Sequence, residues 1–333
     1  MALIAPLLVF VVITFIVPIT SMLFRSVENE IVQNTLPNAV AALASWDSTK
    51  GDLPDEAVFE AMYFDMFLAA EAKRHTRLGT RLNYETTGMS SLFRQSGRKL
   101  DDLGKDIQKP LEALNADWKD ETIWFELMSG AETDPTNQQL IFNQQQRIFN
   151  LLGVPRRSWL ATFFCKIGSV LARPCGTAPE DIDIGFNPSL AISEILPKTT
   201  QEYTAFAFFT VVNDNDIVAE EAPWESVAVA LAADLQAADL TAYDGPGADL
   251  LREAQAADLP APNFTAAFAG IDDDWATSGP WETLQTHSST YTSGYFLNAV
   301  DAQKSPDGVA WQPENKQIPV SYTHLTLPTT PYV

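Results

Sequence analysis

Apolar residues begin the chain in one unbroken run. No charged side chain occurs from Met1 to Phe24, and Arg25 is the first charged residue. A helix that crosses a bilayer needs about 20 mostly apolar residues, whereas the core of a signal peptide needs only about 7–15. No Lys or Arg precedes the run, and no small-x-small cleavage site follows it. We therefore expect residues 1–25 to form a retained transmembrane helix; the alternative is an atypical cleaved signal peptide.

Beyond Arg25 the apolar residues recur at the spacing of α-helices. Between positions 52 and 70 the helix-start signals are Asp52, as the expected N-cap, and Pro54 in the first turn. One apolar stripe then follows at helical spacing: Phe59, Met62, Met66 and Ala70. Such a stripe indicates core packing rather than a ligand site. The pattern predicts a mainly α fold.

Three motifs of the first half return in the second half in the same order. "ADWKDETIWFEL" (116–127) and "DDWATSGPWETL" (273–284) share Asp-Trp, a second Trp six positions later and a Leu three further on. Leu36–Pro37 matches Leu196–Pro197, and "EAVFEAM" (56–62) matches "EAPWESV" (221–227) at nearly the same separation along the chain. The order predicts two related helical units; unrelated alanine-rich helices are the alternative, because such helices share the same helical period.

The spacing within each tryptophan pair also predicts local structure. Six positions of α-helix turn through roughly 600°, so one continuous helix would place both rings of a pair on different faces. We therefore expect a turn between Trp118 and Trp124. A turn is likewise expected between Trp275 and Trp281, where Gly279–Pro280 would supply it.

These patterns divide the chain into five parts. They are a transmembrane helix (1–25), a first helical unit (26–150), a junction (151–186), a second helical unit (187–319) and a tail (320–333). The junction should hold a short buried or interfacial helix, because its apolar stretch at 159–172 is too short to span a bilayer and includes Lys166. The tail, "VSYTHLTLPTTPYV", resembles a translated sequencing adapter, so we exclude it from the fold.

Charge and residue counts exclude several classes of function. The chain has 43 acidic and 21 basic residues and a net charge of −22, and only four of the basic ones lie after position 175. Phosphate binding needs clustered Lys and Arg, so no nucleic-acid partner is expected. Two cysteines, Cys165 and Cys175, are too few for a disulfide framework. His75, His287 and His324 do not have the spacing of a metal or catalytic cluster, and no phosphate-binding P-loop motif occurs. We expect no enzyme, no catalytic, metal-ligating or cofactor-binding residue and no cofactor.

Short motifs of the first half follow the order of a known family. After the apolar run come Arg25–Ser26–Val27, Leu36–Pro37, Trp46–Asp47, "LPDEAVFEA" (53–61), "RLNYE" (81–85) and Asp117–Trp118 with Trp124. This order resembles ABC-transporter permeases of the spermidine/putrescine type, in forms with a large extracytoplasmic insertion after the first membrane helix. The resemblance covers roughly residues 2–150. In the second half, "YTSGYFLNAVDAQKSPDG" (291–308) resembles the same insertion.

The resemblance implies a fold class and a function. The fold is expected to be mainly α, with one N-terminal transmembrane helix followed by two related helical extracytoplasmic units. The chain would be a truncated, polyamine-like permease component of an ABC importer in the bacterial inner membrane, with residues after 26 mostly periplasmic. It would lack the translocation core and the ATPase-docking loop.

The implied partners are an ABC ATPase, a second permease subunit, a periplasmic substrate-binding protein and membrane lipid. Two alternatives stay open. The first is a single-pass membrane-anchored extracytoplasmic binding or scaffold protein. The second is a chimeric assembly of two permease ends joined near residues 173–184, where the balance of charge changes.

Overall fold

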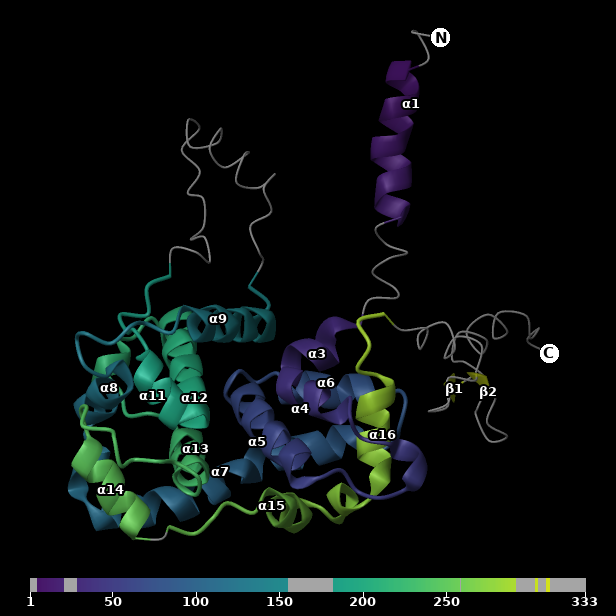
Figure 1. Cartoon of the computed structure of the whole chain (residues 1–333). Helices are drawn as coiled ribbons and strands as arrows, with labels where there is room; N and C mark the ends of the chain where they lie inside the picture. The colour runs from purple at the N-terminus through teal and green to yellow at the C-terminus, as the bar shows by residue number, and fades with distance from the viewer. Residues whose placement is uncertain are drawn as a thin grey trace, which may run out of the picture.

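The structure of the chain is a computed structural model that describes residues 5–20, 29–154, 182–257, 259–291, 303–304 and 310–311 (Figure 1). It is mainly α-helical, as the sequence predicts. The described helices of the first half are α1 (Ala5–Val11), α3 (Glu30–Thr35), α4 (Pro37–Leu43), α5 (Glu56–Glu71), α6 (His75–Leu82), α7 (Met89–Leu114), α8 (Glu121–Ser129) and α9 (Gln138–Leu152). Those of the second half are α11 (Leu190–Ile195), α12 (Pro197–Phe209), α13 (Glu225–Leu235), α14 (Ala248–Ala256), α15 (Phe264–Ile271) and α16 (Ser278–Thr286).

Short elements connect these helices. The 3₁₀ turns are η2 (Ser48–Lys50), η3 (Ala116–Lys119), η7 (Val218–Glu220) and η8 (Asp273–Ala276), and the π-helical turns are η1 (Val12–Ile16) and η6 (Thr210–Asp214). Strand β1 (Gln303–Lys304) pairs antiparallel with β2 (Ala310–Trp311), with Gln303 opposite Trp311. The apolar helix expected at 159–172, both cysteines and the tail 320–333 lie outside the described residues.

The N-terminal helix stands away from the body of the protein. Helix α1 continues through η1 and stays helical to position 20 (Figure 1). Its large apolar side chains from Leu8 to Ile19 are exposed to solvent, except that of Val12, which is partly buried. In the described part of the chain, no helix is both long and apolar enough to cross a membrane. The transmembrane helix expected for residues 1–25 is therefore not supported; positions 1–4 and 21–25 lie outside the described residues.

Both halves of the chain build the same series of elements. A short helix, α3 or α11, ends just before a leucine, and a second helix, α4 or α12, begins at the proline that follows. The linking residues Leu36 and Leu196 have nearly the same backbone angles, φ −129° and ψ 55° against φ −122° and ψ 66°. Apart from the π-helical turn η6, which follows α12 and has no counterpart after α4, the order continues with a 3₁₀ turn, three helices, a second 3₁₀ turn and a last helix. These are η2, α5, α6, α7, η3 and α8 in the first half and η7, α13, α14, α15, η8 and α16 in the second.

A buried aspartate occupies the same place in α5 and α13. Asp65 Oδ2 accepts hydrogen bonds from the backbone N–H of Asn38 at 2.7 Å and of Ala39 at 2.9 Å, in the first turn of α4. Asp234 accepts from the N–H of Lys198 at 3.3 Å and of Thr199 at 2.8 Å, in the first turn of α12. The first N–H groups of a helix have no partner within it, so each carboxylate satisfies two of them.

These bonds correct the expected alignment of α5 with α13. When the two halves are aligned so that Asp65 matches Asp234, "PDEAV" (54–58) aligns with "PWESV" (223–227). The expected match of "EAVFEAM" with "EAPWESV" is therefore wrong by about one helical turn, because such a shift keeps the apolar stripe on the same face. The expected N-cap is also wrong. Asp55, not Asp52, caps α5 by accepting from the N–H of Val58.

The tryptophan pairs have the same local structure, as expected. Trp124 Nε1 donates to the carbonyl oxygen of Trp118 at 2.9 Å, and Trp281 Nε1 donates to that of Trp275 at 3.1 Å. The ring centroids are 5.0 Å apart in both pairs, with interplanar angles of 55° and 52°. The predicted turn within each pair is confirmed. However, Gly279–Pro280 lies inside α16, and the chain turns earlier, where Thr277 is extended.

The two halves of the chain exchange their last elements in space. The first lobe contains α3–α6, most of α7, and α15 and α16 from the second half. The second lobe contains α11–α14 together with the end of α7, η3, α8 and α9 from the first half. Figure 1 shows the exchange, since yellow-green α16 lies beside the purple and blue helices α3–α6. Residues 26–150 and 187–319 therefore do not form separate bodies.

Helix α7 makes this exchange possible. Its 26 residues carry the chain from the core of the first lobe, which includes Phe93 and Ile107, into the core of the second, which includes Leu111. It passes α13 at Gly104, where an added Cβ would meet Glu225 Cβ at 2.5 Å. Only a glycine permits this close approach of the two helices.

Because each core contains residues from both halves, we expect the lobes to unfold together. Phe268 is fully buried in the first lobe and Phe206 is buried in the second. Replacing either by alanine should lower the free energy of unfolding by about 3–5 kcal/mol and should shift one common transition. Urea denaturation followed by far-UV circular dichroism measures this, with exposed Phe142→Ala as the control. Two separate transitions, with only one of them shifted by Phe268→Ala, would contradict the exchange.

Candidate functional site

Among the polar clusters and hollows of the described residues are a buried charged cluster, an acidic pocket and a cavity beside the tryptophans. The sequence predicts no catalytic, metal-ligating or cofactor-binding residue. Within the described residues, no group of three or more His, Cys, Asp or Glu side chains is placed to hold a metal ion. His75 Nδ1 lies 3.4 Å from the carbonyl oxygen of Ala69, and His287 Nε2 lies 4.0 Å from Glu85 Oε2. His324 lies outside the described residues.

The charged cluster joins the two lobes. Arg147 on α9 donates from Nη1 to Glu202 Oε1 at 2.7 Å and from Nη2 to Asp65 Oδ1 at 3.1 Å. Asp65 belongs to the first lobe and Glu202 to the second, and all three side chains are buried. Gln144, one turn before Arg147, accepts a third bond at 3.3 Å. One guanidinium thus binds a carboxylate from each lobe.

Burial sets the protonation of this cluster. Loss of solvent raises the pKa of Asp65 to about 6, although Arg147 and the amides of Ala39 and Asn38 act to lower it. Burial also acts to lower the pKa of Arg147, but Glu202 and Asp65 outweigh burial and raise it. The cluster joins a side chain of each lobe through one buried guanidinium.

The sequence patterns predict no such cluster, although the sequence contains one signal of it. Asp65 stands between Phe64 and Met66 in a helix that is buried on nearly every side. A carboxylate is almost never buried unless it is paired, so its presence there requires a cationic or hydrogen-bonding partner. Arg147 has no such signal, because it lies in a polar run rich in glutamine and asparagine.

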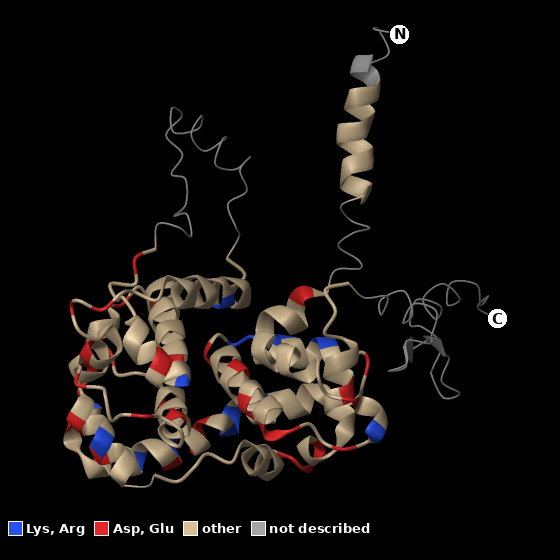
Figure 2. Ribbon diagram, viewed as in Figure 1, with Lys and Arg blue, Asp and Glu red and all other residues tan. Residues whose placement is uncertain are grey.

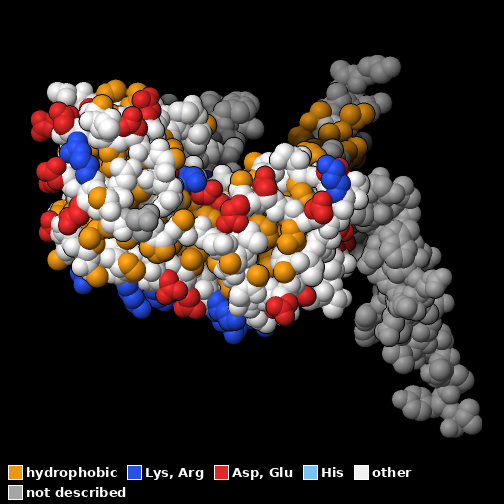
Figure 3. Space-filling model, turned by 60° about the horizontal axis from the view of Figure 1, so that its bottom comes forward, with side chains coloured by type: hydrophobic (Ala, Val, Ile, Leu, Met, Phe, Trp, Pro, Cys, Tyr) orange, Lys and Arg blue, Asp and Glu red, His pale blue; other side chains and the backbone are white. Residues whose placement is uncertain are grey.

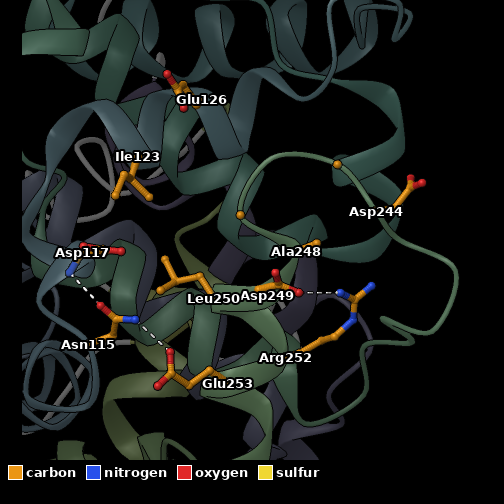
Figure 4. Close-up of a pocket in the computed structure, with 12 residues that line it drawn as sticks. Asn115, Asp117, Ile123, Glu126, Asp244, Ala248, Asp249, Leu250, Arg252 and Glu253 are labelled. Atoms are coloured by element: carbon orange, nitrogen blue, oxygen red, sulfur yellow. Dashed lines mark hydrogen bonds and ion pairs between the residues drawn. The ribbon is translucent and has the colours of Figure 1, made fainter.

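The acidic pocket lies between η3, α8 and α14 in the second lobe (Figure 4). Its volume is about 610 Å³, and its carboxylates come from Asp117, Glu126, Asp244, Asp249 and Glu253. Arg252 is the one cation among its lining residues and pairs with Asp249 at 3.1 Å, while Asn115 Nδ2 donates to Glu253 at 2.8 Å. The carboxylates favour a cation. All five are exposed, however, so water and salt weaken the attraction.

The third place is a smaller cavity of about 260 Å³ beside the first tryptophan pair. Its walls are Leu111, Trp118, Trp124, Pro223, Trp224 and Ala228, and its polar edge is Gln108, Glu112 and Lys119. The indole nitrogen of Trp118 is buried and has no acceptor among the described residues. In the other lobe, Trp275 Nε1 donates to Ser96 Oγ at 2.9 Å. The two pairs thus share a backbone arrangement but differ in their surroundings.

Comparison with known proteins adds no identification. Neither the models of known protein families, nor the curated proteins, nor the solved structures match this chain. The resemblance to importer permeases therefore stays a prediction.

The different surroundings of the tryptophans predict different costs for similar substitutions. Ser96→Ala should lower the free energy of unfolding by about 1–3 kcal/mol, because it leaves the buried N–H of Trp275 without an acceptor. Urea denaturation measures this. In a double-mutant cycle, Ser96→Ala should cost less in the Trp275→Phe background, where no N–H remains to be satisfied. Equal costs in both backgrounds would contradict the role of this hydrogen bond.

The raised pKa of Asp65 predicts a dependence of stability on pH. Between about pH 4 and pH 6 the native state binds a proton that the unfolded state has released, because the pKa is about 6 in the fold and 3.8 for an aspartate free in water. The free energy of unfolding should therefore fall as pH rises through this window, by at most about 1.4 kcal/mol per pH unit from this residue. Urea denaturation from pH 4 to 7 should show this slope in the wild type relative to Asp65→Asn. A difference in the free energy of unfolding between the two proteins that stays constant from pH 4 to 7 would contradict the prediction.

Proposed function

We propose that the chain is a membrane-attached, extracytoplasmic helical part of an ABC importer permease, of polyamine type by resemblance. The observation that carries the proposal is the N-terminal helix. It is apolar, exposed and separate from the helical body (Figures 1 and 3). In this proposal, the helix enters the lipid bilayer.

The exposure of the helix supports this role. Phe10, Ile13 and Phe15 keep 58%, 61% and 57% of their surface exposed, whereas residues of the two cores are almost fully buried. Transfer of apolar surface out of water stabilises by about 25 cal/mol per Å², so a lipid or protein partner is expected to cover this surface. Lipid fits best, because the uncharged run is unbroken from Met1 to Phe24.

The paired geometry of the two halves supports a duplicated insertion. Both halves resemble the same extracytoplasmic insertion in sequence, and both place an aspartate and a tryptophan pair in the same arrangement. In the proposal these are two related helical units outside the cytoplasm. Acidic residues are spread over both lobes (Figure 2). Such a surface suits a periplasmic domain that remains soluble.

The proposed partners are those that the resemblance implies. They are an ABC ATPase, a second permease subunit, a periplasmic substrate-binding protein and membrane lipid.

The second candidate function is that of a single-pass membrane-anchored binding or scaffold protein. The solvent-open acidic pocket favours it, since five carboxylates against one arginine suit a cationic partner (Figure 4). Genes for an ATPase and a substrate-binding protein beside this one would favour the importer, and their absence the binding protein.

Charges placed in the exposed helix should release the protein from the membrane. We expect the wild type in the carbonate-washed membrane fraction and Phe10→Lys/Ile13→Lys in the soluble fraction, because a lysine at a bilayer centre costs about 2.5–3.5 kcal/mol. Immunoblots of the two fractions measure this. The control is Tyr84→Lys/Phe142→Lys, which adds the same charge at exposed positions of the body. A protease added to intact spheroplasts should degrade the wild type, which tests its extracytoplasmic location.

Two outcomes would count against the proposal. The double lysine variant would remain in the membrane fraction if another part of the chain attached it. The wild type would resist the protease in intact spheroplasts, yet be degraded after lysis, if the body lay in the cytoplasm.

A further inference from the structure

The two lobes place different side chains at one equivalent position beside their tryptophan pairs. The shared aspartate cap aligns Phe59 of α5 with Ala228 of α13. The shared tryptophan motif aligns Trp281 and Phe268 with Trp124 and Leu111. One lobe therefore shows what fills this position, and the other shows the same position without a ring.

In the first lobe a phenyl ring fills the position. The centroid of the Phe59 ring lies 4.5 Å from that of Trp281, edge to face, and 6.0 Å from that of Phe268. Phe59 is 1% exposed. Such edge-to-face and tilted contacts are the arrangements that aromatic rings prefer.

In the second lobe the same position is hollow. Ala228, Trp124 and Leu111, the counterparts of Phe59, Trp281 and Phe268, all line the cavity of about 260 Å³. The tripeptide before each helix also corresponds, since Ala222–Pro223–Trp224 lines the cavity where the first lobe has Leu53–Pro54–Asp55. Trp224 does not fill the space, because its ring packs against Phe206 and Phe209, with centroids 4.9 Å and 5.0 Å away.

The size and edge of the cavity define the ligand. An engineered apolar cavity of about 150 Å³ binds benzene, so the present volume accepts one ring with a short substituent. The polar edge is formed by Gln108 and by Glu112 and Lys119, whose charged atoms are 3.7 Å apart. The Lys119 side chain is 62% exposed, so this edge faces water. A hydroxyl or similar neutral group on the substituent would find both donors and acceptors there.

We propose that this cavity binds a small molecule with a single aromatic ring and a short polar substituent. The ring takes the place that Phe59 holds in the first lobe, edge to face against Trp124. The polar substituent points to Gln108, Glu112 and Lys119. This site is independent of membrane attachment and of the proposed transport role, and it is separate from the acidic pocket of Figure 4.

Fluorine NMR with 4-fluorobenzyl alcohol tests the site on the full chain in detergent. Wild type should give a saturable shift or broadening with one site per chain. Ala228→Phe should abolish it, because the new ring occupies the cavity as Phe59 does in the other lobe. Cyclohexylmethanol, which has the same size but no aromatic ring, should compete at least tenfold more weakly.

A second variant keeps the test decisive if Ala228→Phe fails to fold by circular dichroism. Ala222 is exposed and lines the cavity, so Ala222→Phe should fold and weaken binding at least tenfold. The matched control is Ala57→Phe, at an exposed alanine of α5, which should bind as the wild type does. No saturable binding by the wild type would overturn the proposal, as would equal binding by the folded cavity variants. Equal competition by cyclohexylmethanol would overturn the preference for an aromatic ring.

Discussion

The two lobes are joined by a buried carboxylate, Asp65. One of its oxygens accepts the first N–H groups of α4, and the other accepts from Arg147. Arg147 in turn binds Glu202 on α12, so the start of one helix in the first lobe is connected through two charges to the second lobe. Because a buried ion pair gains little over apolar packing, while a lone buried charge is strongly destabilising, we infer that this cluster specifies which helices meet rather than adding much stability.

The second half repeats the carboxylate without the arginine. Asp234 also satisfies the start of a helix, but its additional partner is the hydroxyl of Thr199 at 2.7 Å rather than a guanidinium. Burial raises the pKa of Asp234 as well, against the hydrogen bonds from Thr199 and Lys198 that lower it. The cap is therefore what the two halves have in common. The link between lobes belongs to the first half alone, where α9 brings Arg147 between α5 and α12.

What the sequence could predict follows from how distinctive each residue is. The sequence aligns the tryptophan pairs correctly, because an Asp-Trp followed six positions later by Trp cannot be shifted without losing the match. The expected alignment of α5 with α13 is wrong because alanine, valine and leucine match equally well one helical turn away. The apolar periodicity does not reveal the exchange of α8 and α16 between the lobes, because each helix buries the same face whichever lobe it packs into. The length of α7 accounts for the exchange. Its 26 residues span about 39 Å, so the end of the helix lies away from its own half.

The differences between the halves are more informative about function than their likeness. The aspartate caps, the leucine–proline links and the tryptophan hydrogen bonds occur in both lobes, and each one satisfies backbone or indole groups that any such fold must satisfy. Two differences between the lobes meet no such requirement. Phe59 has a ring where Ala228 has a methyl group, and the indole N–H of Trp275 has an acceptor whereas that of Trp118 has none among the described residues. Close packing is the normal state of a protein interior, and the first lobe shows that these same elements can achieve it. The hollow in the second lobe therefore follows from its side chains and not from its backbone, which is why a single substitution at position 228 can test whether it is a site.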